Sequence, residues 1–231
     1  MSSKVWILLI SFACVVQQPS FDQDVLLGST DKHIYKGVLQ EEAYHAFKQM
    51  QASALKEGIE IQIVSGYRSY ERQKQIWNGK YQRYTKQGLS PEAAIAKIIE
   101  YSTIPGTSRH HWGTDMDIID ASKTRPKSAL QTEHFEEGGI YRDLKLWMEA
   151  NADAYGFCLV YTDEPKRKGF RFEPWHYSYQ PIAKPMLEAY NKLDLLQILL
   201  ADKIEGSTYL TRTFINKYKQ ENVLDINPYL K

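Results

Sequence analysis

Apolar residues recur along the first part of the chain with two different spacings, and each spacing predicts an element. After Gly58, residues 59–63 alternate isoleucine with polar residues, which predicts a strand with one buried face. Residues 40–57 place apolar side chains three or four positions apart, as on one face of a helix. These side chains are Ala43, Phe47, Met50 and Ala54.

Turn and cap residues mark the elements that follow. A Ser-Gly pair ends the strand, and the next helix is expected to begin within residues 67–77. Ser90 as the cap and Pro91 at the first helical position predict a helix that runs to about residue 101. In residues 115–118 aspartate alternates with apolar residues, which predicts a strand with one acidic and one apolar face.

The second half of the chain predicts a hairpin and a run of helices. The expected elements are a surface excursion at 123–139, a helix at 144–151, two paired strands at 157–161 and 170–172, a strand at 175–179, and helices after the prolines of 181–185. This pattern predicts an α+β fold with a small, mainly antiparallel sheet flanked by helices. Residues 185–231 are expected to form a helical C-terminal extension.

Length and composition indicate one globular domain. The chain has 231 residues, 43% of them hydrophobic, which suits a single domain over residues 22–231. Its 29 basic residues are nearly balanced by 28 acidic ones, and loss of residues 1–13 would remove one basic residue and complete the balance. A neutral protein of this kind has no electrostatic footprint for nucleic acid. We expect a monomer.

The first residues are typical of an export signal. Lys4 precedes an apolar run over residues 5–16, too short to span a bilayer but suited to a secretory signal. Small residues favour cleavage after residue 13, and Cys14 then fits a loose lipoprotein signal with an acylated thiol. Export to the periplasm or cell envelope is therefore predicted, with a lipid anchor through Cys14 as one form of it. Cys158 lies in an apolar run and predicts no disulfide.

Two distant segments carry candidate metal ligands. His110, Asp117 and His176 provide two imidazoles and one carboxylate, the ligand count of a catalytic zinc that keeps one position open. The seven steps from His110 to Asp117 would span about 23 Å if extended, far more than two ligands of one ion allow. The chain must therefore reverse, and Gly113 tolerates the backbone that a tight reversal needs.

Neighbouring residues leave alternatives open. His111 either points away from the metal or replaces His110 as a ligand. Asp115 either orients a ligating imidazole or is merely solvated. Glu173 is either a fourth ligand, which would make the zinc structural, or the base that takes a proton from water; we favour the base. Pro174 interrupts a regular strand ladder and lets the side chains around it converge.

An upstream loop predicts a recognition element. Residues 65–73 read Ser-Gly-Tyr-Arg-Ser-Tyr-Glu-Arg-Gln, with Arg68 placed where a strand ends. A guanidinium at such a loop suits bidentate binding of a carboxylate. The alternative, a surface arginine that caps a helix, is equally compatible with this segment alone.

These segments together resemble the VanY-type D-alanyl-D-alanine carboxypeptidases, zinc peptidases of the lysostaphin, D-Ala-D-Ala metallopeptidase and hedgehog group. The family pattern Ser-x-His-x-x-Gly-x-Ala-x-Asp corresponds to residues 108–117, with Asp115 where the family usually has alanine. The pattern Glu-x-x-His corresponds to residues 173–176, and the Ser-Gly-Tyr-Arg-Ser loop with its later glutamine to residues 65–73. The resemblance covers a motif core of about residues 36–180.

The resemblance implies a role for each matched residue. His110, Asp117 and His176 would hold zinc, and Glu173 would be the general base. Arg68, Gln73 and Ser108 would contact the peptide carbonyl and the terminal carboxylate of the substrate. Arg68 would also be a catalytic group. The implied activity is hydrolysis of the terminal D-alanyl-D-alanine bond of peptidoglycan stem peptides.

Other functions are open on the same residues. The same scaffold suits an L,D-carboxypeptidase, a D,D-dipeptidase or an endopeptidase, because pocket shape rather than the ligand set separates them. A non-catalytic wall-binding module with a relic zinc site is a different class of protein. The presence of both Glu173 and Arg68 argues against it, since a relic site needs neither.

Overall fold

The structure is a computed structural model that describes residues 20–231. The predicted signal over residues 1–13 and the possible lipidation site at Cys14 lie outside this range, so both stay predictions. Within the described range, every helix is too short or too polar to cross a bilayer.

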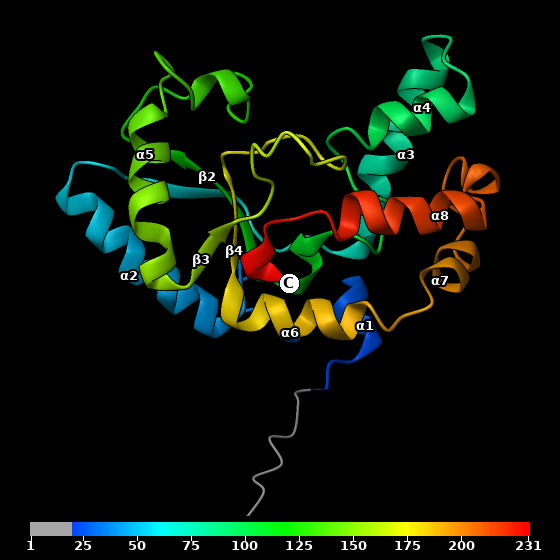
Figure 1. The fold of residues 1–231 in the computed structure, drawn as a ribbon, viewed down its shortest axis with the longest axis horizontal. Coiled ribbons are helices and arrows are strands. Elements are labelled where there is room, and N and C mark those ends of the chain that lie inside the picture. Colours follow the sequence, from blue (N-terminus) through cyan, green and yellow to red (C-terminus); the bar gives the residue numbers. More distant parts are fainter. Residues whose placement is uncertain (1–19) are drawn as a thin grey trace, which may run out of the picture.

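A four-stranded antiparallel sheet with the order β1-β2-β4-β3 lies at the centre of the fold (Figure 1). Its strands are β1 (Ile61–Ser65), β2 (Asp115–Asp120), β3 (Phe157–Leu159) and β4 (His176–Tyr179). Together with the surrounding helices, this sheet confirms the predicted α+β class. The two central strands are β2 and β4, which brings two segments about 60 residues apart in sequence side by side.

Helices cover the sheet and extend the molecule to one side of it (Figure 1). Helices α2 and α5 lie next to the sheet, whereas α3, α4, α7 and α8 gather at the opposite end and α6 runs between the two ends. Their bounds are α1 (Gln23–Leu27), α2 (Glu41–Lys56), α3 (Tyr70–Lys86), α4 (Pro91–Ile98), α5 (Arg142–Asn151), α6 (Gln180–Tyr190), α7 (Leu195–Ala201) and α8 (Arg212–Tyr218).

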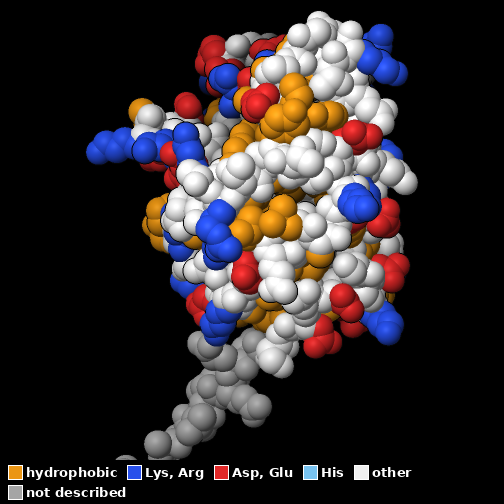
Figure 2. Space-filling model, turned by 90° about the vertical axis from the view of Figure 1, so that its right-hand side faces the viewer, with side chains coloured by type: hydrophobic (Ala, Val, Ile, Leu, Met, Phe, Trp, Pro, Cys, Tyr) orange, Lys and Arg blue, Asp and Glu red, His pale blue; other side chains and the backbone are white. Residues whose placement is uncertain are grey.

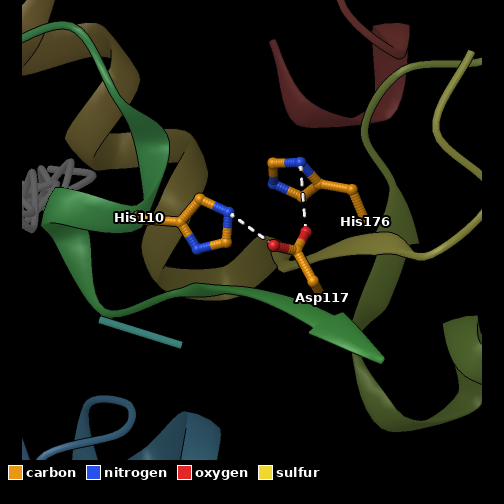
Figure 3. A group of neighbouring side chains, drawn as sticks. All are labelled: His110, Asp117 and His176. Atoms are coloured by element: carbon orange, nitrogen blue, oxygen red, sulfur yellow. Dashed lines mark ion pairs between the residues drawn. The ribbon is translucent and has the colours of Figure 1, made fainter. Parts of the chain in front are cut away.

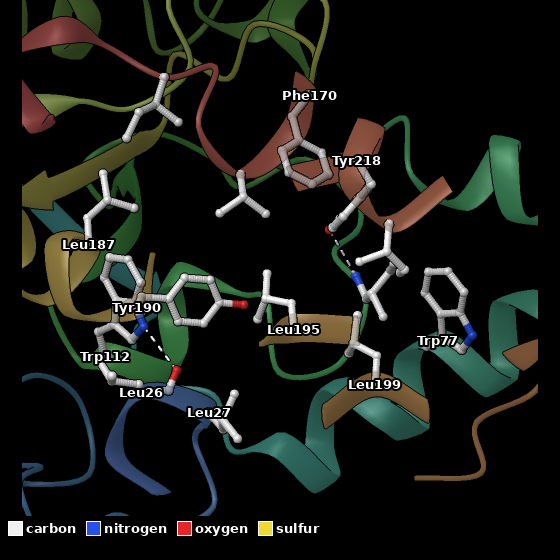
Figure 4. Close-up of a cluster of buried hydrophobic side chains, with 14 of the residues drawn as sticks. Leu26, Leu27, Trp77, Trp112, Phe170, Leu187, Tyr190, Leu195, Leu199 and Tyr218 are labelled. Atoms are coloured by element: carbon white, nitrogen blue, oxygen red, sulfur yellow. Dashed lines mark hydrogen bonds between the residues drawn. The ribbon is translucent and has the colours of Figure 1, made fainter. Parts of the chain in front are cut away.

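Two clusters of buried apolar side chains hold these layers together. One lies between the sheet and helices α2 and α5, with Met50, Met116 and Leu144 among its members. The other joins helices α1, α3, α4, α6, α7 and α8 around Trp77 and Trp112 (Figure 4). The side chain of Ile182 on α6 packs against both clusters and links them.

The helices after residue 185 are part of the core rather than an appendage to it. Tyr218 and Leu230 are buried in the same cluster as Leu26 and Trp77. The indole Nε1 of Trp77 donates to the carbonyl of Glu205 at 2.9 Å. At this end of the molecule some apolar side chains also reach the surface between polar and charged ones (Figure 2).

The predicted hairpin of residues 157–161 with 170–172 is wrong. Strand β3 pairs with β4 instead, and residues 170–172 form no strand. The apolar side chain of Phe170 is instead buried between Tyr161 and Tyr218 in the helical core. A short apolar run does not distinguish a strand from an irregular segment that packs into a core.

One further expectation needs correction. Helix α6 begins at Gln180, before the prolines rather than after them. Pro181 lies in its first turn, where the missing N–H has no partner in any helix. The strand predicted over residues 115–118 is present as part of β2, and all six residues of β2 are buried, including the aspartates of the predicted acidic face.

Candidate metal centre and cleft

The three predicted ligands lie together in the structure (Figure 3). His110 comes from a 3-10 turn (Arg109–Trp112), Asp117 from β2 and His176 from the first position of β4. One ligand atom from each residue lies within 4.8 Å of the others, and all three residues are buried. Asp117 and His176 are direct partners across the β2–β4 ladder, so sheet register brings them together.

The reversal predicted between His110 and Asp117 is confirmed. Gly113 ends the 3-10 turn with a φ of 66°, in the left-handed region that favours glycine. A Cβ atom at this position would also overlap the side chain of Ile34. The turn therefore requires glycine for two reasons, and it returns the chain directly into β2.

Neighbouring groups orient both imidazoles toward Asp117. Nδ1 of His110 donates to the carbonyl of Gly66 at 2.9 Å, which leaves Nε2 free at 3.4 Å from Oδ2 of Asp117. Nε2 of His176 donates to Asp115 at 3.0 Å, which leaves Nδ1 at 3.8 Å from Oδ1 of Asp117. Ligating histidines are commonly held in this way, by a hydrogen bond to the ring nitrogen that does not ligate.

The polar atoms of this group suit a divalent cation. Oδ1 of Asp117 is buried and has no hydrogen-bond partner among residues 20–231. Burial would raise the pKa of Asp117, but the imidazole of His110 lowers it to about 2, so the carboxylate is charged. Two imidazole nitrogens and one carboxylate oxygen are a donor set that zinc prefers.

Asp115 lies behind His176 in a fully buried ion pair. Nε of Arg109 donates to Oδ2 of Asp115 at 2.8 Å, and the hydroxyls of Thr114 and Ser178 donate to Oδ1. Burial opposes the charge of Asp115, but Arg109 and His176 keep its pKa well below the usual range. Of the two alternatives for this residue, the structure places Asp115 where it orients His176.

His111 points away from the three candidate ligands and holds the loop that follows β1. Its Nδ1 donates to the carbonyl of Arg68 at 2.6 Å, and its Nε2 accepts from the backbone N–H of Gly106 at 3.1 Å. Burial lowers the pKa of His111 to about 3, so the ring is neutral. The structure therefore gives no support to His111 as a substitute for His110.

Glu173 lies beside the three candidate ligands without belonging to their group. Its Oε2 is 3.1 Å from Nδ1 of His176, and only 9% of the residue is exposed. Burial would lower the pKa of His176, but the hydrogen bonds that its ring donates to Asp115 and Glu173 raise it to about 10. The carboxylates of Glu173 and Asp117, which favour a proton on Nδ1 of His176, would equally favour a metal cation at that position.

Arg68 approaches the group from the loop after β1. Its Nη2 is 4.0 Å from Oδ2 of Asp117 and donates to the hydroxyl of Ser65 at 2.9 Å. Its Nη1 donates to Oε1 of Gln73 at 3.1 Å. The guanidinium thus has a fixed position at the rim of the site.

The structure gives Gln73 a different place from the one predicted. The residue is fully buried and does not line the cleft, because Nε2 donates to the carbonyl of Thr103 at 2.7 Å and Oε1 accepts from Arg68. Gln73 therefore holds Arg68 instead of contacting a ligand directly. Ser108, by contrast, lines the cleft, and its contact with a substrate stays a prediction.

A cleft of about 690 Å³ opens onto these residues. Its walls include four side chains that the sequence did not single out as site residues: Lys80, Arg109, Tyr161 and Trp175. The ring of Tyr161 meets the ring of His176 edge to face at 5.1 Å, and burial raises the pKa of its phenol well above the usual value. The cleft is thus lined by aromatic rings and by three cations, including Arg68.

Comparison with known sequences identifies a family and several relatives of this chain. The sequence profile described as VanY, D-alanyl-D-alanine carboxypeptidase, matches residues 36–182. A putative carboxypeptidase, YodJ of Bacillus subtilis, is 36% identical over 155 residues, which are 65% of this chain and 50% of the relative. A D-alanyl-D-alanine carboxypeptidase of Enterococcus faecalis is 30% identical over 128 residues, or 55% of this chain and 42% of the relative.

Solved structures of the same family share the fold. VanYB in complex with D-alanine-D-alanine aligns with a TM-score of 0.51 at 24% identity, over 71% of this chain and 84% of that one. A VanY D,D-pentapeptidase variant in complex with Zn(II) aligns with a TM-score of 0.50 at 24% identity, over 70% and 83%.

The family match covers the elements that build the candidate site. Residues 36–182 include β1 to β4 and every predicted ligand, whereas the later helices lie beyond the match. The chain spans about half the length of several curated relatives that it matches. On this evidence the chain belongs to the VanY family of D-alanyl-D-alanine carboxypeptidases.

Proposed function

We propose that the protein is a zinc-dependent carboxypeptidase that hydrolyses the terminal D-alanyl-D-alanine bond of peptidoglycan stem peptides. The observation that carries this proposal is the convergence of His110, Asp117 and His176 with Glu173 and Arg68 in one cleft. The enterococcal relative described as a D-alanyl-D-alanine carboxypeptidase supports the substrate class.

The three ligand residues would hold the zinc ion through Nε2 of His110, a carboxylate oxygen of Asp117 and Nδ1 of His176. When bound, zinc supplies a Lewis acid that polarises the scissile carbonyl and lowers the pKa of water to about 7. Three protein ligands leave a coordination position open, as catalytic zinc sites do.

Glu173 is the proton carrier in this proposal. Its carboxylate lies beside Nδ1 of His176 and faces the cleft, where it takes a proton from the attacking water and passes it to the leaving amine. The guanidinium of Arg68 stabilises the negative charge that develops on the carbonyl oxygen. Asp115 keeps the ring of His176 in the required orientation.

Incubation of the purified protein with pentapeptide and tetrapeptide muropeptides, with and without a chelator, tests this activity. We expect release of one D-alanine from the pentapeptide, loss of the activity with chelator, and recovery on addition of zinc. Asp117→Asn should abolish the release, whereas Asp163→Asn, an exposed acid outside the cleft, should not affect it. Cleavage of the tetrapeptide alone would show an L,D-carboxypeptidase instead.

Penicillin provides a second arm of the same experiment. Because water attacks directly and no serine is acylated, we expect penicillin at low stoichiometry to leave the release of D-alanine unchanged. Inhibition by one equivalent of penicillin would contradict the mechanism while leaving the family assignment intact.

We also propose that the protein acts in the cell envelope after export, where peptidoglycan is accessible. The apolar run over residues 5–16 and the thiol of Cys14 support this location and a lipid anchor at Cys14. Labelling of cells with a palmitate analogue should mark the natural sequence and not Cys14→Ser. An unlabelled but exported protein would show a cleaved secretory signal without lipidation.

A further inference from the structure

A lysine in the cleft has no role in the chemistry described above. Lys80 lies on α3, is half-buried and lines the same cleft as Arg68. Its Nζ donates to the hydroxyl of Ser102 at 3.0 Å. Ser102, itself 9% exposed, also lines the cleft. The ammonium group and its hydroxyl partner are therefore accessible to a ligand from the cleft.

The charge of Lys80 is not balanced by an acid at contact distance. No carboxylate within residues 20–231 forms an ion pair with it, whereas Lys74 on the same helix is paired with Asp202 at 2.7 Å. Burial and the nearby guanidinium groups of Arg83 and Arg68 lower the pKa of Lys80, and the carboxylate of Glu173 offsets this only in part. A partly desolvated cation among other cations is unfavourable until an anion binds to it.

A continuous row of contacts connects Lys80 to the candidate metal ligands. Arg68 lies 4.0 Å from Asp117 and bonds to Gln73, whose amide bonds to the carbonyl of Thr103. The residue before Thr103 in the chain is Ser102, the partner of Lys80. The cleft thus presents two cations: Arg68 beside the candidate ligands and Lys80 on α3.

We propose that Lys80 and Ser102 form a subsite that binds a carboxylate of the substrate peptide. The inference rests on the proposed peptidase function and extends it, because Arg68 is engaged at the reacting carbonyl and a second anionic group needs a second cation. Two carboxylates of a stem peptide fit this chemistry: the free C-terminal carboxylate and a carboxylate on a residue upstream of the scissile bond.

Steady-state kinetics of Lys80→Met tests the subsite, since methionine keeps the apolar stem and removes the charge. We expect KM for the acidic peptide to rise about 10-fold, as for loss of one charge-assisted hydrogen bond, with kcat nearly unchanged. Lys80→Arg should recover most of the affinity. Lys86→Met, at an exposed position on the same helix, is the matched control and should leave KM unchanged.

Peptide pairs identify the carboxylate. In one pair the C-terminus is a carboxylate or a carboxamide, with the carboxamide measured as a competitive inhibitor. In the other pair an upstream acid is free or amidated. The 10-fold difference between the natural protein and Lys80→Met should disappear for the one peptide that lacks the bound carboxylate.

Two results would overturn the subsite: an unchanged KM in Lys80→Met, or the same loss of affinity for every peptide regardless of its carboxylates. Failure of the proposed activity is a separate result, because the natural protein would then release no D-alanine from any peptide. In that case calorimetric titration of the zinc-loaded protein with the same peptides still measures the contribution of Lys80.

Discussion

Arg109 and Asp115 form a buried charge pair whose two members have different consequences when removed. Asp115 is fully buried and contacts both Arg109 and His176, whereas Arg109 contacts no candidate ligand directly. Stability should therefore depend on the pair, and metal affinity on Asp115 alone.

We expect Asp115→Ala and Arg109→Met each to lower the free energy of unfolding by about 3–5 kcal/mol, since each removes one member of a buried ion pair and leaves the charge of the other. The double variant should lose clearly less than the sum of the two. Zinc affinity should fall about 10–100-fold in both variants that lack Asp115, including the double one. Denaturant unfolding and competition with a chromogenic chelator measure the two quantities; additive losses of stability would show that the charges are independent.

Glu173 can be separated from the ligands by its effect on metal content. We expect Glu173→Gln to keep bound zinc, because the three candidate ligands form a group without it, and to lower kcat at least about 100-fold through loss of the base. Metal analysis of the purified variant, with His176→Ala as the comparison that should lose zinc, checks this. A Glu173→Gln protein without zinc would make Glu173 a ligand.

The convergence of the three candidate ligands followed from the sequence in part for physical reasons that act locally. Glycine at position 113 and the alternation of residues 115–118 both reflect backbone geometry, and the structure contains the turn and the strand. Lys80 was missed, although it shares a helix face with Gln73 and Ile76, because only the tertiary fold shows that this face borders the cleft. Gln73 was misplaced because the pattern that names it does not show its burial.

At the scale of elements, α7 is attached to α3 by one acidic side chain. Asp202 follows α7 and accepts hydrogen bonds from the hydroxyl of Tyr70 at 2.6 Å and from Lys74 at 2.7 Å, both on α3. Burial would raise the pKa of Asp202, but its bonds with Lys74 and Tyr70 lower it. Because its pKa is lowered on folding, Asp202 stabilises the folded state at any pH above the pKa that it has in the unfolded chain. This stabilisation is lost as the pH falls through the pKa that it has in the folded protein.

We expect Asp202→Asn to lower the free energy of unfolding by about 1 kcal/mol near pH 7. The gap between the variant and the natural protein should narrow as the pH falls toward about 3, because Asp202 takes up its proton at a higher pH in the unfolded protein than in the folded one. Denaturant unfolding at both pH values measures the gap. Asp163→Asn, at an exposed position, should show none at either pH; a gap for Asp202→Asn that stays constant would assign the effect to shape rather than charge.

The sequence predicted the element boundaries that capping residues define, but not those that depend on packing in the core. Ser90 accepts from the backbone N–H of Ala93 and Pro91 occupies the first turn, so the start of α4 followed from the sequence. The strand predicted over residues 170–172 is absent because Phe170 packs into the helical core, whose members come from six helices. No local pattern contains that information.

At the scale of the whole molecule, bound metal should contribute to stability, because the ligands come from three separate elements. Zinc at about 100 times its dissociation constant would add about 2.7 kcal/mol. For a chain of this length, removal of the metal should lower Tm by about 5–10 °C, with recovery on addition of zinc. Thermal unfolding with and without chelator measures the shift, and Asp117→Asn should show none; an equal shift in that variant would place the metal elsewhere.

The burial of residues near position 230 beside Leu26 and Trp77 also bears on how the protein is made. A ribosome releases the chain in order, so the helical core lacks several of its apolar members until almost all of these residues have emerged. Until then Trp77, Trp112 and their neighbours remain exposed to water, which is the state that chaperones bind. Folding of this half therefore waits until residue 230 has emerged, and a chain stopped before that point would be a substrate for quality control rather than a shorter enzyme.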